Sequence, residues 1–242
     1  LTQGNCERIG QKGGAPNHNV AIKNILAGLT HPETGIIDDI KAINAVGHRV
    51  VHGGDRFKKS VRITPDVLRA IRAVASLAPL HIPANIMGIE SAMDVLTDVP
   101  QIAVFDTAFH HTLPPAAYLY PVPYNWYEAF GVRKYGFHGS SQLYVSKRAA
   151  MWLKKPNDQV NLITLHIGNG VSFTAIRNGI SVDTSMGLTP LEGAMMGTRS
   201  GDIDPAIVGF MAKRLNVSCA KIIDALNNKS GHLGITESLS DR

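Results

Sequence analysis

The sequence predicts an α/β protein, because short β-rich runs occur along the chain together with helices that begin at recognisable caps. Residues 101–105 form a nearly continuous apolar run, which is typical of a strand buried on both faces. Residues 162–183 contain three further β-rich runs joined by glycine turns, and these indicate an antiparallel meander. Thr64-Pro65 and Asp204-Pro205 each combine a capping side chain with a proline that suits the first helical turn.

Residues 1–110 are expected to form the first domain, and one of its strands leads directly to a candidate ligand-contacting residue, Asp106. Strand 101–105 delivers Asp106 at its carboxyl end, which is where open α/β sheets place residues that contact ligands. The expected elements, in order, are helix 20–29, strand 45–51, a helix from Thr64-Pro65, helix 84–96 and strand 101–105.

Residues 111–242 are expected to form the second domain. Prolines at 114–115 and at 121 and 123 interrupt regular structure, so the region after Asp106 is the best candidate for a domain boundary. Ser140 or Ser141 is expected to cap a helix that runs to about Lys154. The remaining expected elements are strands 162–166, 171–176 and 180–183, a helix from Asp204-Pro205, and a last helix over 218–227.

The charge and cysteine content narrow the class of protein. The 242 residues carry a formal net charge of +5, but no run of five or more lysines and arginines occurs, so a small anionic substrate is expected rather than nucleic acid. Cys6 and Cys219 are far apart and indicate neither a disulfide framework nor a zinc site. No apolar stretch approaches the roughly 18 residues needed to cross a bilayer, so a cytoplasmic protein without a membrane partner is expected.

Two features are candidates for binding phosphate or metal. Gly168-Asn169-Gly170 lies between two predicted strands, and its glycines would let backbone N–H groups approach a phosphate. Because Asn-Gly is also the commonest hairpin signal, an ordinary turn is the alternative. The Asp106 carboxylate could hold Mg²⁺ or orient a reacting oxygen, and the alternative is a cap of the next turn.

Arginines and histidines supply the candidate donors. Arg49 lies inside an apolar strand and Arg199 lies between two glycines, and a planar guanidinium suits carboxylate and phosphoryl oxygens. A buried ion pair is the alternative for each arginine. His81, His138 and His166 lie beside turn residues, although a lone histidine is more often structural than catalytic. His110 and His111 are expected on a strand with their rings pointing apart, and the histidines show no metal-site spacing.

Six segments resemble the signature segments of the acetate kinase family, in that family's order and at about its spacing. They are His48–Gly54, Ala78–His81, Val104–His110, Lys134–Gly139, His166–Gly170 and Met196–Arg199. The resemblance covers the chain from about Ala45 to its end. It implies the duplicated ribonuclease-H-like fold shared by acetate and sugar kinases, heat-shock ATPases and actin, with the active site in the cleft between two domains.

The resemblance also implies a role for each matching residue. Arg49 and Arg199 would bind the carboxylate and the transferred phosphoryl group, and His138 would hydrogen-bond that group in the transition state. Asp106 would help to place Mg²⁺ or the attacking carboxylate. The ATP phosphates would be lined by His166, Gly168, Asn169 and Gly170, and His81 would lie near the acetyl group. The pocket for the methyl group would consist of Val51, Leu80, Phe137 and Pro190.

The implied activity is the reversible transfer of the ATP γ-phosphoryl group to acetate, which produces acetyl phosphate and ADP and supports acetyl-CoA formation. The resemblance implies Mg²⁺ or Mn²⁺ as cofactor, direct in-line attack and a homodimer. Propionate kinase is the close alternative and butyrate kinase a more distant one. Val51 favours acetate, because a smaller residue would leave more room for the substrate. The alternative from another class is a non-catalytic domain that binds small anions.

The chain departs from the family pattern at both ends. An opening strand with an Asn-Cys-Gly-Ser-Ser-type turn is missing, since Gly4-Asn5-Cys6-Glu7 does not match it. The sequence stops at Arg242, before the family's glycine-rich segment for adenosine and its late Mg²⁺-assisting glutamate. The second domain is therefore expected to be incomplete, with poor affinity for nucleotide.

Overall fold

The computed structural model describes residues 3–78 and 81–240, and the chain divides into two compact units. The first unit comprises Leu1–Gly53 and Lys59–Phe105, and the second comprises Gly54–Lys58 and Asp106–Arg242. The division thus falls directly after the strand that ends at Phe105, and a short segment before Lys59 belongs to the second unit.

The first unit contains a three-stranded sheet in the order β1-β3-β2. Strand β1 (Val46–Val50) pairs in parallel with β3 (Gln101–Phe105), and His48 lies opposite Ala103. Strand β2 (Val61–Arg62) pairs antiparallel with β3 and was not predicted, because two residues carry no readable pattern. Both expected strands are confirmed, although alternate residues of β3 are only half-buried, so β3 is not buried on both faces.

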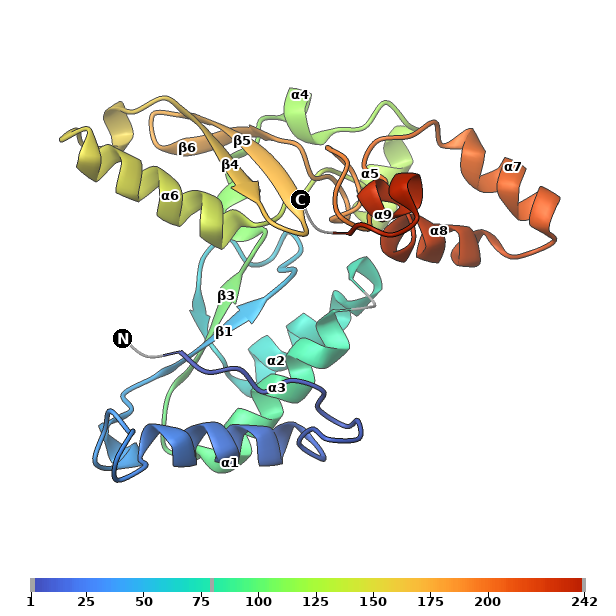
Figure 1. Cartoon of the computed structure of the whole chain (residues 1–242). Coiled ribbons are helices and arrows are strands. Elements are labelled where there is room, and N and C mark those ends of the chain that lie inside the picture. The colour runs from blue at the N-terminus through green and yellow to red at the C-terminus, as the bar shows by residue number, and fades with distance from the viewer. Residues whose placement is uncertain (1–2, 79–80, 241–242) are drawn as a thin grey trace. The chain divides into compact units, whose positions relative to one another are not determined.

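Three α-helices accompany this sheet: α1 (His18–Leu29), α2 (Pro65–Ala73) and α3 (Ile82–Val95), with short 3₁₀ turns at Ile40–Ala42 and Ala75–Leu77. The predicted cap of α2 is confirmed, since Thr64 Oγ1 accepts a hydrogen bond from the Val67 amide at 3.3 Å. Helix α1 packs beside α3 (Figure 1). The core of the first unit includes the fully buried side chains of Val50, Ile71, Ile82 and Ile89.

The second unit contains the predicted antiparallel meander, which is confirmed in the order β4-β5-β6. Its strands are β4 (Leu162–Ile167), β5 (Val171–Arg177) and β6 (Ile180–Thr184). Asn178 and Gly179, with φ of 52° and 75°, join β5 to β6, and two positive φ values are typical of a type I′ hairpin turn. Helix α6 (Gly139–Trp152) packs along this sheet (Figure 1).

The expected cap of α6 is wrong in position. The helix already begins at Gly139, because His138 adopts the left-handed conformation with φ of 56° and turns the chain there. Ser140 and Ser141 therefore lie in the first helical turn, and their hydroxyls serve other partners. Ser140 Oγ donates to Asp106 Oδ1 at 3.3 Å, and Ser141 Oγ lies 2.9 Å from His166 Nδ1.

One further expectation about the second unit is wrong, and another is confirmed in position but not as the last helix. His110 and His111 lie on a 3₁₀ helix, Ala108–Thr112, and not on a strand, because β3 already ends at Phe105. The helix expected over 218–227 is α8 (Cys219–Asn228), with Ser218 as its cap, but α9 (Gly231–Thr236) follows it. The other elements are α4 (Pro115–Tyr118), α5 (Tyr124–Phe130), a 3₁₀ turn at Asn157–Gln159 and α7 (Ala206–Leu215).

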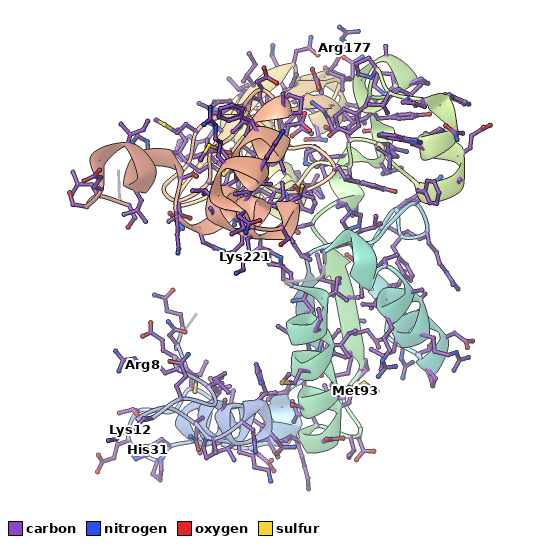
Figure 2. The ribbon with its side chains drawn as sticks, turned by 90° about the vertical axis from the view of Figure 1, so that its right-hand side faces the viewer. Arg8, Lys12, His31, Met93, Arg177 and Lys221 are labelled. Atoms are coloured by element: carbon purple, nitrogen blue, oxygen red, sulfur yellow. The ribbon has the colours of Figure 1, made fainter. Side chains whose placement is uncertain are left out.

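The surface of the second unit carries scattered basic side chains. Arg177 at the end of β5 and Lys221 on α8 are exposed and point outward from different elements (Figure 2). No helix formed by residues 3–78 or 81–240 is both long and apolar enough to span a bilayer.

Two buried histidines make stability depend on pH. His52 in the first unit and His110 in the second are fully buried, and this burial lowers the pKa of each from its ordinary value near 6.5 to about 4. The hydrogen bond of His110 to the Phe137 carbonyl and the charge of Asp106 both favour the protonated form, but burial outweighs them. Between about pH 4 and 6.5, the buried histidine of each folded unit stays neutral, whereas the same histidine in the unfolded chain binds a proton.

Acidification from pH 7 to pH 4 is expected to destabilise the second unit by on the order of 3 kcal/mol through His110 alone. The contribution is complete above the unfolded pKa near 6.5 and is lost as the pH falls towards the folded pKa of about 4. Urea unfolding at a series of pH values measures it. His110→Gln, which removes the titrating ring, should flatten the profile in this window, and an unchanged slope would contradict the assignment.

Candidate active site

Two stacked histidines lie where helix α6 begins beside the β4–β5 sheet. The ring centroids of His138 and His166 are 3.9 Å apart, with an angle of 26° between the ring planes. His138 Nδ1 lies 2.9 Å from Ser172 Oγ, and His166 Nδ1 lies 2.9 Å from Ser141 Oγ. Each imidazole is therefore oriented by a serine on its Nδ1 side.

The predicted glycine turn lies against this histidine pair. It connects β4 to β5, and the Gly168 amide donates to the Gly170 carbonyl oxygen at 3.0 Å. A methyl group at Gly170 would lie 3.2 Å from His138 Cε1 and Nε2 and 3.4 Å from Arg199 Nη1. Glycine at this position therefore leaves space for one imidazole and one guanidinium beside the turn. An ordinary hairpin turn does not need that space.

Asn169 connects the turn to the loop that carries Arg199. The Gly197 amide donates to the Asn169 carbonyl oxygen at 3.1 Å, and the Asn169 side chain lies so close to Gly197 that a methyl group there would overlap it. The Met196 amide donates to the Arg199 carbonyl oxygen at 3.0 Å and closes the loop. Backbone contacts thus hold the phosphate-binding candidate and the arginine loop together.

The Arg199 guanidinium is charged, and no carboxylate of residues 3–78 or 81–240 pairs with it. Within the described part of the chain, its hydrogen-bond partners are the Pro190 carbonyl oxygen at 3.3 Å and the Met196 sulfur at 3.9 Å. Burial lowers the pKa of Arg199 below its usual value, but a guanidinium stays protonated in proteins. Among the described residues no ion pair involves Arg199, and its fork of donors suits an anionic ligand.

Asp106 is the first residue after β3, and it lies at the N-terminus of α6. It is 1% exposed, its carbonyl oxygen accepts from the Gly139 amide at 2.9 Å, and its Oδ1 accepts from Ser140 Oγ. Among residues 3–78 and 81–240, no group of three or more histidine, cysteine, aspartate or glutamate side chains could hold a metal ion. One carboxylate such as Asp106 can suffice for Mg²⁺, because this ion usually keeps several waters and is held partly by substrate phosphates.

The other predicted site residues divide between the two units. In the first unit, Arg49 is exposed on β1, the half-buried Val51 donates its amide to Asn85 Oδ1 at 3.0 Å, and His81 directly precedes α3. In the second unit, Phe137 is buried and Pro190 is half-buried beside Arg199. Leu80 lies outside the described residues.

The structure adds supporting residues that sequence inspection missed. Gln142 and Ser172, 1% and 0% exposed, form a hydrogen-bonded pair behind His138, and Gly197 provides space for Asn169. Ser172 gave no signal, because a polar residue between Val171 and Phe173 fits the ordinary alternation of a strand. Gln142 gave no signal either, since a glutamine in a helix is ordinary.

Comparison with known proteins gives a consistent family assignment. The Acetokinase family model matches residues 2–242, so the likeness extends further towards the N-terminus than the expected start near Ala45. The acetate kinase of Trichlorobacter lovleyi is 60% identical over 227 residues, which is 94% of this chain and 54% of that protein. The acetate kinase of Geobacter metallireducens is 61% identical over 228 residues, with the same coverage of 94% and 54%.

Solved structures agree with this assignment. The acetate kinase of Porphyromonas gingivalis matches with a TM-score of 0.87 at 46% identity, over 93% of this chain and 57% of that chain. A propionate kinase from Francisella tularensis matches with a TM-score of 0.85 at 44% identity, over 96% and 57%. The expected α/β fold of this kinase class is confirmed, and the chain spans about half the length of these relatives. The chain belongs to the acetokinase family.

Proposed function

We propose that this chain carries the phosphoryl-binding part of an acetate kinase, which transfers the ATP γ-phosphoryl group reversibly to acetate. The observation that supports this most directly is the close approach of His138 and Arg199 at Gly170. An imidazole donor, and a guanidinium with no carboxylate partner among the described residues, lie beside a glycine turn and form a suitable receptor for a phosphoryl group. The names of the relatives support the same reaction class.

The proposed chemistry relies on positioning and charge. An acetate oxygen attacks the γ-phosphorus in line, a new carboxyl–phosphorus bond forms, and the bond to ADP breaks with its electrons retained by ADP. Negative charge is carried by the equatorial oxygens during transfer, where Arg199 and the His138 ring would stabilise it. No covalent phosphoenzyme is needed.

The remaining predicted residues are proposed to bind the two substrates. Arg49 and His81 would bind the carboxylate end of the substrate, and the ATP phosphates would lie along the turn at 168–170 and His166. The small apolar pocket for the methyl group would consist of Val51, Leu80, Phe137 and Pro190. We accordingly propose that the unit ending at Phe105 is the carboxylate-side domain and that the other unit is part of the nucleotide-binding domain.

Mg²⁺ or Mn²⁺ is the proposed cofactor, with Asp106 as the carboxylate of this chain that would help to hold it. When bound with the nucleotide, the ion would neutralise phosphate charge. Asp106 also accepts the Ser140 hydroxyl, which fixes one carboxylate oxygen at the start of α6. A cytoplasmic homodimer is the proposed state of the whole protein.

Propionate is the second candidate acceptor, because the Francisella tularensis relative is described as a propionate kinase. Trapping of the acyl phosphate product as a hydroxamate, with acetate, propionate and butyrate in parallel, decides between the acceptors. The highest kcat/KM is expected for acetate, and a higher value for propionate would reverse the assignment. One methylene changes binding by only about 1–3 kcal/mol, so the margin is expected to be small.

The chain itself is tested by mixing it with acetyl phosphate, ADP and Mg²⁺ and following the formation of ATP. ATP formation would exclude the alternative of a non-catalytic, anion-binding domain. If no ATP forms but acetyl phosphate shifts the imidazole resonances of His138, the chain binds the phosphoryl group without turnover. If neither occurs, the proposed function fails for this chain.

A further inference from the structure

A buried chain of hydrogen bonds connects Gln142 and Ser172 to His138. Gln142 Nε2 lies 2.8 Å from Ser172 Oγ and 3.1 Å from the Ser172 carbonyl oxygen, and Ser172 Oγ lies 2.9 Å from His138 Nδ1. Gln142 is 1% exposed, Ser172 is 0% exposed and His138 is 9% exposed. Solvent therefore has little access to these groups, and they must satisfy one another.

The direction of these hydrogen bonds follows from which atoms can donate. The Ser172 carbonyl oxygen only accepts, so the Gln142 amide must present its nitrogen there, and the same nitrogen then donates its second hydrogen to Ser172 Oγ. The Ser172 hydroxyl hydrogen still needs an acceptor, and His138 Nδ1 is the acceptor that lies within reach. The imidazole nitrogen that accepts carries no hydrogen, so the ring's hydrogen is on Nε2.

His138 Nε2 is on the side of the ring that meets the candidate site. A methyl group on Gly170 would lie 3.2 Å from His138 Nε2, so this nitrogen approaches the turn proposed to hold phosphate. The backbone holds the ring in this place, because His138 sits in the left-handed conformation at the start of α6 and the adjacent Gly139 amide is bonded to Asp106.

We infer that Gln142 and Ser172 are positioning residues that hold neutral His138 in the Nε2–H tautomer, so that the ring donates a hydrogen bond to an anionic oxygen at Gly170. The opposite tautomer would present a lone pair to that oxygen and repel it. The identity of the anion as a phosphoryl group rests on the proposed function. The tautomer itself does not depend on that function.

The test is a ¹⁵N spectrum of the imidazole rings in the full chain, recorded at a pH where His138 is neutral. Deletion of one signal set in His138→Gln assigns the resonances. The expected result is a non-protonated Nδ1 and a protonated Nε2 for His138 in the unaltered chain. A protonated Nδ1 would overturn the inference, and this result needs only the unaltered chain and the assignment variant, whether or not variants of Ser172 and Gln142 fold.

Ser172→Ala tests the role of the serine directly. It removes the hydroxyl that lies 2.9 Å from His138 Nδ1, so the ring is expected to interconvert between both tautomers and to show averaged Nδ1 and Nε2 shifts. Gln142→Met, which keeps the side-chain length but cannot donate, should shift the average in the same direction by a smaller amount. An unchanged His138 signal in Ser172→Ala would refute the positioning role.

Ser181→Ala is the matched control. Ser181 is also 0% exposed, and its hydroxyl also lies 2.9 Å from a buried imidazole nitrogen, Nδ1 of His110, which has no role in the proposed site. This variant is expected to change the His110 signals and to leave those of His138 as they are. A change at His138 in both variants would show a general loss of packing and would contradict a specific relay.

The kinetic readout separates this inference from the proposed function. If the chain forms ATP, Ser172→Ala should lower kcat about tenfold with a smaller change in KM for acetyl phosphate, because the weakened hydrogen bond acts in the transition state. An unchanged kcat would show that the tautomer has no catalytic use. If the unaltered chain forms no ATP while its spectrum shows the Nε2–H tautomer, the proposed function fails and the positioning inference stands.

Discussion

Replacement of Arg199 by alanine is expected to lower kcat/KM for acetyl phosphate by about 10²–10³-fold, which is the usual effect of removing one preorganised donor from a developing anion. Arg199 is the guanidinium that lies against Gly170 in the second unit, and no carboxylate of the described residues neutralises it. Its loss should therefore remove charge stabilisation directly. Steady-state formation of ATP from acetyl phosphate and ADP measures the effect.

Two variants test whether this effect is specific to the Arg199 fork. Arg199→Lys keeps the charge but not the planar pair of donors, so it should recover only a small part of the loss. Arg177→Ala removes an exposed arginine at the end of β5, outside the site, and should leave activity within twofold of the unaltered chain (Figure 2). If Arg199→Ala retained more than a third of the activity, the proposed role would be wrong. Loss of activity together with a lowered thermal midpoint would indicate unfolding instead.

Replacement of Gly139 by alanine is expected to destabilise the second unit by about 3 kcal/mol, which is at the upper end of the usual effect of overpacking. The new methyl group would overlap the carbonyl oxygen of Asp106 and lie 3.2 Å from Phe109 Cβ. A backbone carbonyl cannot move aside as the end of a flexible side chain can. The clash should therefore also displace Asp106 and His138 from their places at the start of α6. Urea unfolding followed by circular dichroism measures the loss.

Gly209→Ala is the control for this substitution. Gly209 is a helical glycine in α7 of the same unit, and a methyl group there would meet nothing within 4 Å. Alanine is favoured over glycine in a helix by up to about 1 kcal/mol, so this variant should be neutral or slightly more stable. Equal destabilisation by both variants would show that helix propensity dominates and would contradict the steric explanation at Gly139.

The features that could be predicted from the sequence are those that depend on near neighbours in the chain. Thr64-Pro65 predicted the start of α2, because a cap and a first-turn proline act within one helical turn. Asn178-Gly179 predicted the β5–β6 turn, because both positions need positive φ. The early start of α6 was missed, since the hydrogen bonds there join Gly139 to Asp106 and His138 to Ser172, which lie far away in the sequence.

By itself, the sequence determined the α/β class, the order of the long elements, the family likeness and the candidate residues His138, His166, Gly170 and Arg199. Those properties follow from the residue types, from the spacing of apolar residues along the chain and from the order of the motifs. Only the tertiary structure decided that His138 and Arg199 both lie where a side chain at Gly170 would be, that Arg199 has no carboxylate partner among the described residues, and that Ser172 and Gln142 support His138. Contacts between residues that are distant in the chain depend on packing, and no local pattern records which buried groups satisfy one another.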